Sequence, residues 1–392
     1  MVDWMIIGGG IQGCTVASFL LKSRKTTTER LRIIDPGSKP LTNWKRMTSL
    51  IEMPFLRSPF VHHIDVAPFS LQNFAKKSFS RNHFYGDYKR PSLELFNAHC
   101  DETLEEAGVE KCWLQGRVKK VERDGNHWAV QTEDGSVLKS KYVVIAIGVT
   151  EQPVWPEWAK HVKTINPSRI FHIFDQEVQT VEEFSPPFLI IGGGITAAHL
   201  AIKLGRQFPG QVTLLTRHPF RLHDFDSDPG WLGQKYLRSF HQISCFGERR
   251  KKIRQARHKG SMPRDVYRTL RALEKKQSLA IIEGEIDAES IIRDSQHINV
   301  CLSHSKEWIK AGSIVLANGF DPSLPGGDWL ESLIRQEHLM CADCGYPIVS
   351  KTLEWCPHLF VAGALAELEV GPAARNVSGA RMAAERIVTS VQ

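Results

Sequence analysis

The chain has 392 residues, of which 42% are hydrophobic and 24% are charged, and its formal net charge is +7. These values are typical of a globular protein with enough residues for two or three domains. No apolar run approaches the 18 residues of a membrane-spanning helix, so we expect no membrane partner. The eight cysteines form no disulfide framework, and the first motif begins at residue 8, which leaves no room for a cleaved signal peptide. Both features favour the cytoplasm.

An apolar stretch, 5–7, runs directly into a glycine-rich turn near the start of the chain. The turn reads Gly8-Gly9-Gly10-Ile11-Gln12-Gly13, which is the pattern Gly-x-Gly-x-x-Gly. Gly8, Gly10 and Gly13 permit a tight turn from strand to helix and let backbone N–H groups approach a pyrophosphate at the helix N-terminus. A second apolar segment ends in Asp35, about 20 residues further on, where a carboxylate accepts hydrogen bonds from a ribose.

The same device occurs again in the middle of the chain. Residues 188–191 lead into Gly192, Gly194 and Ala197, with alanine as the third small residue. The next apolar segment ends in Arg217 and His218 in place of an acid, which suits the 2′-phosphate of NADPH better than the ribose of NADH. A single glycine-rich turn is weak evidence. Two of them, each between a strand and a helix, indicate a protein that binds two dinucleotides.

Each half then continues with a hairpin and an apolar strand that ends in glycine. In the first half this strand covers 142–147 and ends at Gly148, and in the second it covers 313–318 and ends at Gly319. The repeat therefore extends well beyond the two glycine loops. We expect two similar α/β units, each with a parallel sheet.

The whole chain resembles the two-dinucleotide-binding flavoproteins, which include flavin-containing monooxygenases, ornithine and lysine N-hydroxylases, and glutathione or thioredoxin reductases. The resemblance implies an α/β fold of two Rossmann-like domains, with an NAD(P)H-binding domain, 156–319, inserted in a discontinuous FAD-binding domain, 1–155 and 320–392. The chain would return to the FAD domain through 358–364. Ala364 stands there in place of the acidic residue that is usual in the reductases.

The motifs and the resemblance together predict the cofactor-binding residues. Those for FAD are Gly8, Gly10, Gly13, Asp35, Val118, Gly148 and Gly363. Those for NADPH, or for NADH as the alternative, are Gly192, Gly194, Ala197, Arg217 and Gly319. No metal site is predicted.

Three segments resemble the monooxygenase branch. Residues 44–59 resemble the region Phe-Leu-x-Asp-Leu…Arg-x-Pro of N-hydroxylases, and 371–381 resembles their closing helix. His172 fits the last position of the flavin-monooxygenase pattern Phe-x-Gly-x-x-x-His, although Asn166 and Ser168 replace its Phe and Gly. This branch implies a flavoprotein monooxygenase that acts on a small molecule through a C4a-(hydro)peroxyflavin.

Two alternatives remain open. The first is an NAD(P)H-dependent flavin reductase or dehydrogenase that passes electrons to a quinone, a dithiol or another acceptor. Cys341 and Cys344 form a Cys-x-x-Cys pair that can serve as such a dithiol, although they lie outside the positions used by the known reductase branches. The second is a sensor or scaffold that binds both cofactors without turnover.

Oxygenation of this kind needs no protein nucleophile, so the sequence offers only weak catalytic candidates, namely Arg57, His62 and His63. Glu367 and Glu369 are expected near the flavin edge. The densest basic run, 249–259, lacks interleaved aromatic residues and predicts a solvated surface or a nucleotide-attracting one, so we expect no nucleic-acid partner. The identity of the substrate and the oligomeric state leave no pattern in the sequence.

Overall fold

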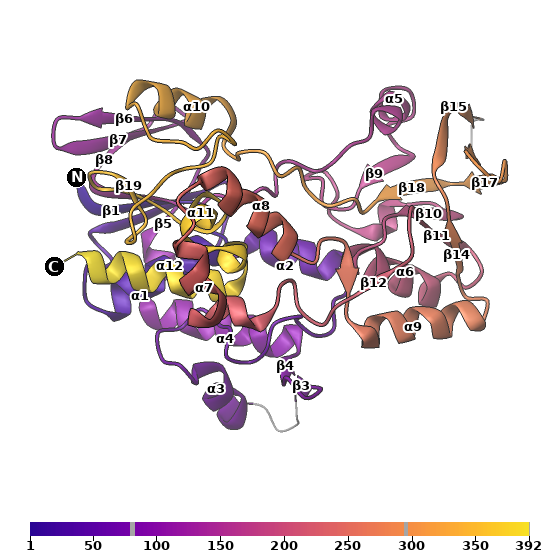
Figure 1. Ribbon diagram of the computed structural model, residues 1–392, viewed down its shortest axis with the longest axis horizontal. Helices are drawn as coiled ribbons and strands as arrows, with labels where there is room; N and C mark the ends of the chain where they lie inside the picture. Colours follow the sequence, from indigo (N-terminus) through magenta and orange to yellow (C-terminus); the bar gives the residue numbers. More distant parts are fainter. Residues whose placement is uncertain (79–82, 294–296, 392) are drawn as a thin grey trace.

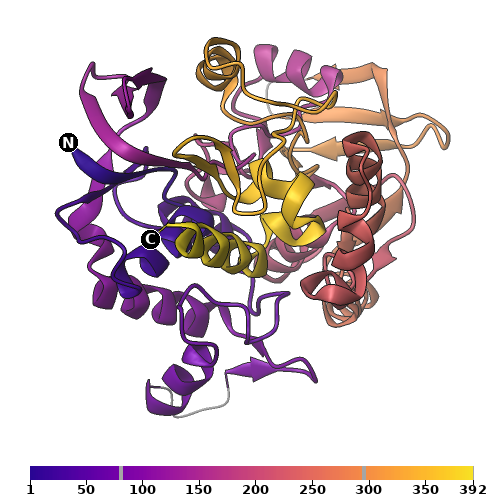
Figure 2. The same ribbon diagram turned by 60° about the vertical axis from the view of Figure 1, so that its left-hand side comes forward.

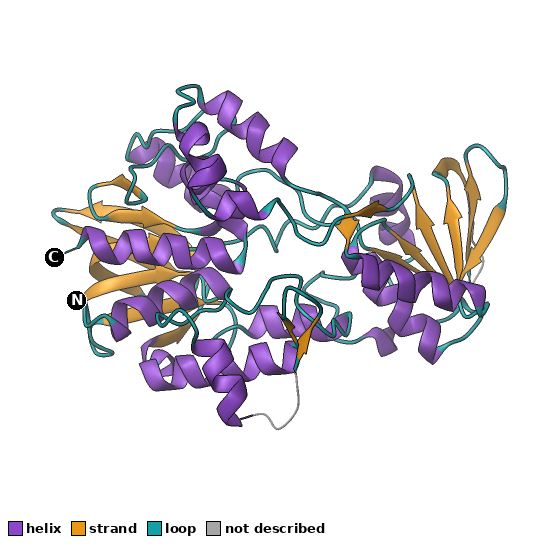
Figure 3. Cartoon of the chain, turned by 60° about the horizontal axis from the view of Figure 1, so that its bottom comes forward, coloured by secondary structure: helices purple, strands orange, loops and turns teal. Residues whose placement is uncertain are grey.

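The computed structural model describes residues 1–78, 83–293 and 297–391. The chain forms two lobes, each built from a sheet with helices packed against it, and extended segments run between them (Figures 1 and 3). Within the described ranges, no helix is long and apolar enough to cross a membrane.

The sheet of the first lobe combines strands from both ends of the chain. Its order is β19-β20-β8-β1-β2-β5, and the pairs from β20 to β5 are all parallel. The hairpin β6–β7 joins it by antiparallel pairing with β8. The strands are β1 (Val2–Ile7), β2 (Leu31–Asp35), β5 (Trp113–Gln115), β6 (Val118–Asp124), β7 (His127–Thr132), β8 (Val137–Ile145), β19 (Glu354–Cys356) and β20 (Leu359–Val361).

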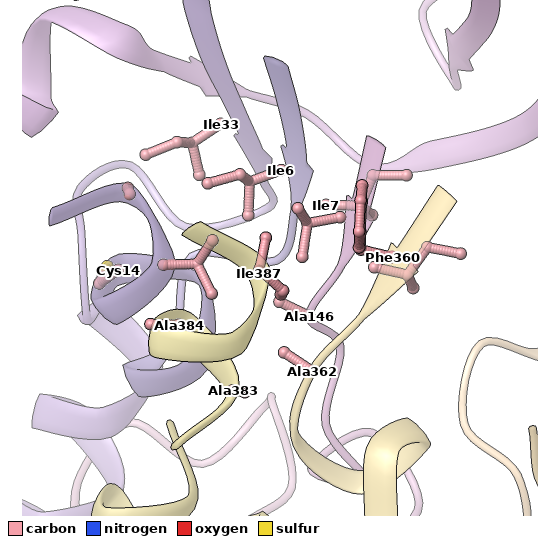
Figure 4. Close-up of a cluster of buried hydrophobic side chains, with 14 of the residues drawn as sticks. Ile6, Ile7, Cys14, Ile33, Ala146, Phe360, Ala362, Ala383, Ala384 and Ile387 are labelled. Atoms are coloured by element: carbon pink, nitrogen blue, oxygen red, sulfur yellow. The ribbon is translucent and has the colours of Figure 1, made fainter. Parts of the chain in front are cut away.

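The helices of the first lobe also come from both ends of the chain. The first and last helices, α1 (Ile11–Lys22) and α12 (Val377–Ser390), pack side by side (Figure 1). Ile6, Cys14, Ala384 and Ile387 meet in the buried core between these helices and the sheet (Figure 4). The other helices of this lobe are α2 (Thr42–Leu50), α3 (Ser70–Ser78), α4 (Leu93–Ala107), α10 (Gly327–Gln336) and α11 (Glu367–Val370), with the 3-10 turns η1 (Val109–Cys112), η4 (Gly363–Ala366) and η5 (Pro372–Arg375).

The sheet of the second lobe has the order β14-β11-β10-β18-β9, with every pair parallel. A separate antiparallel sheet, β15-β16-β17, lies beyond it. The strands are β9 (Ile170–His172), β10 (Phe188–Ile191), β11 (Val212–Thr216), β14 (Ala280–Glu283), β15 (Ile286–Arg293), β16 (Ile298–Leu302), β17 (Trp308–Ala311) and β18 (Ser313–Leu316). The helices of this lobe are α5 (Glu157–Ile165), α6 (Ile195–Gln207) and α9 (Arg264–Lys275), with η2 (Val181–Glu183). The chain after β11 also forms η3 (Pro229–Leu232), α7 (Gln234–His241) and α8 (Phe246–Ala256), which pack against the return segment of the first lobe. Two short pairs, β3 (Phe84–Tyr85) with β4 (Arg90–Pro91) and β12 (Arg221–Leu222) with β13 (Ser261–Met262), complete the structure.

The two parallel sheets repeat one arrangement of strands. The orders β5-β2-β1-β8-β20 and β14-β11-β10-β18-β9 correspond strand by strand. In both, the central strand, β1 or β10, is the one that leads into the glycine loop. The two parallel arrays differ in the origin of the last strand: β20 comes from the C-terminal return, whereas β9 precedes β10 in the chain. The predicted fold class is confirmed, since two Rossmann-like units are present. The exact domain boundaries at 155 and 319 stay a prediction.

The helix α2 ties the two lobes together. Its Leu50, and the adjoining Ile51, are buried in the hydrophobic core of the second lobe, beside Phe174 and Val178. The guanidinium of Arg46, also on α2, donates hydrogen bonds to the backbone carbonyls of Asp175 and Val178. These contacts hold the second lobe at a fixed position next to the segment that follows the first glycine loop.

Candidate active site

The first glycine loop has the tight geometry that its sequence predicts. Gly8 has φ +105°, and a Cβ built on it would lie 2.8 Å from the carbonyl oxygen of Ala146. A Cβ on Gly13 would overlap the carbonyl oxygen of Gly8, so α1 approaches the loop too closely for any larger residue. A Cβ on Gly10, the N-cap of α1, would meet no atom within 4 Å. The helix N-terminus therefore faces open space, as a pyrophosphate site requires.

Asp35 lies beside this loop at the end of β2. One of its carboxylate oxygens accepts a hydrogen bond from the Gly9 N–H at 2.6 Å, and the other accepts one from the Gly37 N–H at 2.8 Å. Burial raises the pKa of Asp35, while these two backbone hydrogen bonds act to lower it. Each oxygen retains a free lone pair. The carboxylate can therefore position the glycine loop and still accept a hydrogen bond from a ribose hydroxyl.

The return segment closes over the same loop from the other side. A Cβ on Gly363 would lie 2.9 Å from Cγ of Gln12, and the amide of Gln12 donates hydrogen bonds to the carbonyls of Ala374 and Asn376. Oε1 of Gln12 is buried and has no partner among the described residues. Gly148, at the end of β8, also faces open space. The unpartnered Oε1 of Gln12 and the open space at Gly10 and Gly148 fit a bound FAD, whose hydroxyl groups would donate a hydrogen bond to this oxygen. Val118 is buried at the start of β6, in the antiparallel hairpin.

The second glycine loop reproduces the first in detail. Gly192 has φ +153°, and a Cβ built on it would lie 2.6 Å from the carbonyl oxygen of Ala317 and 3.2 Å from Cβ of Ala197. Gly194 is the N-cap of α6, and the loop at Gly260 lies just beyond it. Gly319 faces open space, like Gly148 in the first lobe. Arg217 is exposed at the end of β11, beside His218. This arrangement fits the pyrophosphate and 2′-phosphate of NADPH.

A cavity of about 1040 Å³ extends from the second glycine loop to the return segment. One end is lined by Gly192, Gly194 and Arg217, and the other by Glu367 and Arg375. Glu367 lies four residues after Gly363, and Arg375 directly precedes Asn376, so this second end adjoins the residues that cover the first glycine loop. The return segment lies beside α7 and α8 (Figure 2), and α11 contacts α8 directly. The cavity thus extends from the second predicted dinucleotide site toward the segment that covers the first, and the predicted FAD residues are not part of its lining.

Arg57 lines this cavity but is fully engaged by the second lobe. Its guanidinium forms an ion pair with Asp226 at 2.6 Å and donates to the carbonyls of His223, Asp224 and Phe225 and to the hydroxyl of Ser261. Burial lowers the pKa of Arg57, and Asp226 acts in the opposite direction. Its geometry is that of a residue that positions the loop 54–59, with little capacity left for a ligand.

His62 and His63 lie away from the cavity. His63 accepts a hydrogen bond at Nδ1 from the Asp65 N–H, and its Nε2 lies 3.0 Å from the Pro68 carbonyl. Asp65 is paired with Lys22, the last residue of α1, whereas the glycine loop caps the first turn of that helix. The twelve residues of α1 span roughly 18 Å, so the length of this helix separates Asp65 and the neighbouring histidines from the glycine loop. Burial lowers the pKa of His62 to about 4. The structure therefore does not unite the two histidines with Arg57, because their segment turns toward α12 at Arg381.

His172 is a core residue of β9. It is fully buried, its Nδ1 accepts a hydrogen bond from the Phe174 N–H, and it packs against Trp155 and Phe320. Burial lowers its pKa to about 4. Its match to the monooxygenase pattern therefore falls on a position that stabilises the second lobe.

Of the two acids expected near the flavin edge, only Glu367 lines the cavity. Glu367 is buried and forms ion pairs with Arg250 and Arg375. Glu369 points instead to Arg249, His241 and Arg386. Arg250, Arg254 and Arg257 of the basic run 249–259 also line the cavity, whereas Lys251 and Lys252 of the same run are exposed.

The Cys-x-x-Cys pair forms a turn outside the cavity. The Gly345 N–H donates a hydrogen bond to the Ala342 carbonyl, and the backbone of Cys341 forms an isolated antiparallel β-bridge with that of Pro347. Burial raises the pKa of Cys341, and the nearby Cys344 raises it further. Among the residues that the structure describes, no cysteine lines the cavity. Burial thus disfavours the thiolate of Cys341, and neither cysteine of the pair lines the cavity.

Comparisons with known proteins agree with this arrangement. Residues 5–150 match a family model described as FAD-NAD(P)-binding. No curated protein sequence matches the chain. The chain has the fold of the two-dinucleotide-binding flavoproteins, as its sequence predicts, and the predicted cofactor class is confirmed.

Three solved structures illustrate this similarity. The ornithine hydroxylase of Pseudomonas aeruginosa superimposes with a TM-score of 0.77 at 17% identity, over 100% of this chain and 98% of that one. The ornithine N-hydroxylase of Kutzneria sp. 744, in complex with reduced FAD, NADP⁺ and L-ornithine, gives 0.78 at 15% identity, over 100% and 99%. A bacillithiol disulfide reductase of Staphylococcus aureus gives 0.61 at 16% identity, over 100% and 99%. The fold is thus shared by oxygenases and reductases, and the site must distinguish them.

Proposed function

We propose that this protein is an FAD-dependent, NAD(P)H-consuming monooxygenase that oxygenates a small molecule. The observation that carries the proposal is the cavity that extends from the second glycine loop to the return segment, which no described cysteine lines. The similarity in fold to two ornithine hydroxylases supports the same branch. Bound flavin would accept hydride from the nicotinamide and activate oxygen.

The residues of this chain then have three tasks. The N-terminus of α6, at Gly194, binds the pyrophosphate of NADPH, and Arg217 with His218 binds its 2′-phosphate. Trp158, Ile253 and Phe320 form apolar parts of the cavity wall. They exclude water from the reacting atoms, which an oxygenating flavin requires. The buried ion pairs of Glu367 fix the end of the cavity next to the FAD site.

The second candidate is a reductase that uses Cys341 and Cys344, and the similarity to a disulfide reductase keeps it in the test. Purified protein is assayed for bound FAD and for oxygen consumption driven by NADPH, with the double variant Cys341→Ser, Cys344→Ser beside wild type. We expect FAD, oxygen consumption and no effect of the double variant. Loss of electron transfer in that variant would instead identify a dithiol reductase.

A further inference from the structure

Arg257 lies in the cavity without a partner. It is the C-cap residue of α8, and in the described part of the chain no group forms a hydrogen bond or an ion pair with its guanidinium. Burial lowers its pKa and the neighbouring Arg375 lowers it further, whereas the carboxylate of Asp226 acts in the opposite direction. A partly buried guanidinium that forms no hydrogen bond or ion pair and points into a cavity is suited to bind an anion there.

The surroundings of Arg257 are fixed and positively charged. Arg250 stacks on the ring of Tyr346, with its guanidinium carbon 3.8 Å from the ring centroid, and pairs with Glu367. Arg375 pairs with Glu367 at 2.7 Å and donates to the hydroxyl of Tyr346 at 2.8 Å. The geometry of this wall is therefore set before any ligand binds.

The charges of this end of the cavity do not balance. Four arginines are grouped with two carboxylates that are already paired, so this group carries two excess positive charges, and the wall of the cavity also holds Arg217, Arg221, Arg254 and Lys259 with Glu285 as one further acid. Arg57 is paired with Asp226, and both Arg250 and Arg375 are paired with Glu367. Arg257 is the fourth arginine of this group.

The two contacts expected for the nucleotide do not include Arg257. The 2′-phosphate of the nucleotide is expected at Arg217, at the end of β11, and its pyrophosphate at the N-terminus of α6. Arg257 instead neighbours Arg250, Arg375 and Tyr346, which belong to α8 and to the return segment.

We propose that Arg257 is the centre of a second anion site, which binds a carboxylate or phosphate group of the molecule that is oxygenated. The inference rests on the proposed function, because it assigns the substrate to this end of the cavity. It defines the substrate as a small molecule with net negative charge. A purely cationic amine would be repelled by the two uncompensated arginines.

The test measures anion binding to the FAD-loaded protein saturated with NADP⁺. Its thermal midpoint is followed against inorganic phosphate, and separately against succinate, with ionic strength held constant by chloride. We expect a saturable rise in the midpoint of wild type with at least one of the two anions. Phosphate alone would assign a phosphorylated substrate, and succinate alone a carboxylate.

Three variants assign the effect to Arg257. Arg257→Gln should abolish the rise, and Arg257→Lys should weaken the apparent affinity severalfold, since lysine keeps the charge but not the planar fork. Lys251→Ala, on the exposed side of α8, is the matched control and should behave as wild type. FAD content and the midpoint without anion establish that each variant is folded.

Two results would overturn the proposal. The first is the lack of any saturable anion effect in wild type saturated with NADP⁺. The second is a loss of NADP⁺ affinity in Arg257→Gln as large as that in Arg217→Ala, which would assign Arg257 to the nucleotide. Neither measurement depends on turnover, so a failure of the proposed monooxygenase activity is recognised separately.

Discussion

The guanidinium of Arg57 and the carboxylate of Asp226 lie 2.6 Å apart and join two segments that are 169 residues apart in the chain. The segment of Arg57 follows α2, whereas Asp226 belongs to the insertion that follows β11. With Arg46 on α2, this pair fixes the second lobe against the first. The relation of the two dinucleotide sites therefore depends on contacts between lobes, which no local motif encodes.

Replacing Arg57 should damage this interface more than the chemistry. Arg57→Ala removes the ion pair and leaves several carbonyls without a donor, so we expect it to lower the free energy of unfolding by roughly 1–3 kcal/mol, since Asp226 is partly exposed. Arg57→Lys should recover only part of this loss because lysine cannot donate in so many directions. Urea unfolding of the FAD-loaded variants measures the effect. Unchanged stability with lost turnover would show that Arg57 acts on the substrate instead.

Asp35 should contribute to FAD binding through both the loop and the ribose. Asp35→Ala frees the N–H groups of Gly9 and Gly37 and removes the ribose acceptor, so we expect FAD affinity to fall by on the order of 1–3 kcal/mol. Asp35→Asn keeps one acceptor oxygen and should lose less. Titration of the apoprotein with FAD measures both. An affinity equal to that of wild type in Asp35→Ala would assign the ribose to another residue.

Arg217 should determine the preference for NADPH over NADH. Its exposed guanidinium lines the nucleotide end of the cavity, where it can bind a 2′-phosphate as a charge-assisted contact. Arg217→Ala should raise KM for NADPH severalfold or more and leave KM for NADH nearly unchanged. Steady-state kinetics with both nucleotides provide the measurement. Equal losses with both would indicate a role in packing.

Buried neutral histidines should make the protein sensitive to acid. Burial lowers the pKa of His199 on α6 from 6.5 to about 4. Between these two pH values the unfolded chain binds the proton and the folded protein does not, so the free energy of unfolding falls as the pH drops from about 6.5 to about 4. The full contribution of His199 corresponds to roughly 3 kcal/mol.

The variant His199→Gln isolates this contribution. It should make the loss of stability between pH 6.5 and pH 4 smaller than in wild type, because glutamine does not titrate. His304→Gln, at an exposed position, serves as the control and should leave the pH dependence unchanged. Urea unfolding across this pH range measures the slope. Equal slopes in wild type and His199→Gln would mean that His199 is protonated in the folded protein.

The sequence predicted those parts of the site that depend on local backbone geometry. Gly8 and Gly192 have positive φ and lie against the neighbouring strand, which is why both loops are recognisable from residue types alone. Asp35 follows from its place at the end of a buried strand. The returning strand β20 falls within the predicted segment 358–364, whereas the place of β9 beside β18 needed the structure.

The remaining part of the site depends on how distant segments pack. Gln12 acquires its role from the return segment, more than 300 residues away, and Arg257 from the packing of α8 against it. His62 and His63 were weak catalytic candidates together with Arg57, yet their segment turns toward α12. Proximity along the chain predicts little where a loop crosses between lobes.

The most direct test of the proposed function is the reaction of the reduced protein with oxygen. FAD-loaded protein is reduced anaerobically with NADPH and then mixed with oxygenated buffer in a stopped-flow instrument, while the flavin absorbance spectrum is recorded. The proposal predicts a transient species that precedes oxidised flavin and persists longer when NADP⁺ stays bound, because the nucleotide and the cavity wall exclude water. Direct conversion of reduced to oxidised flavin, with the same rate in the presence and absence of NADP⁺, would contradict it.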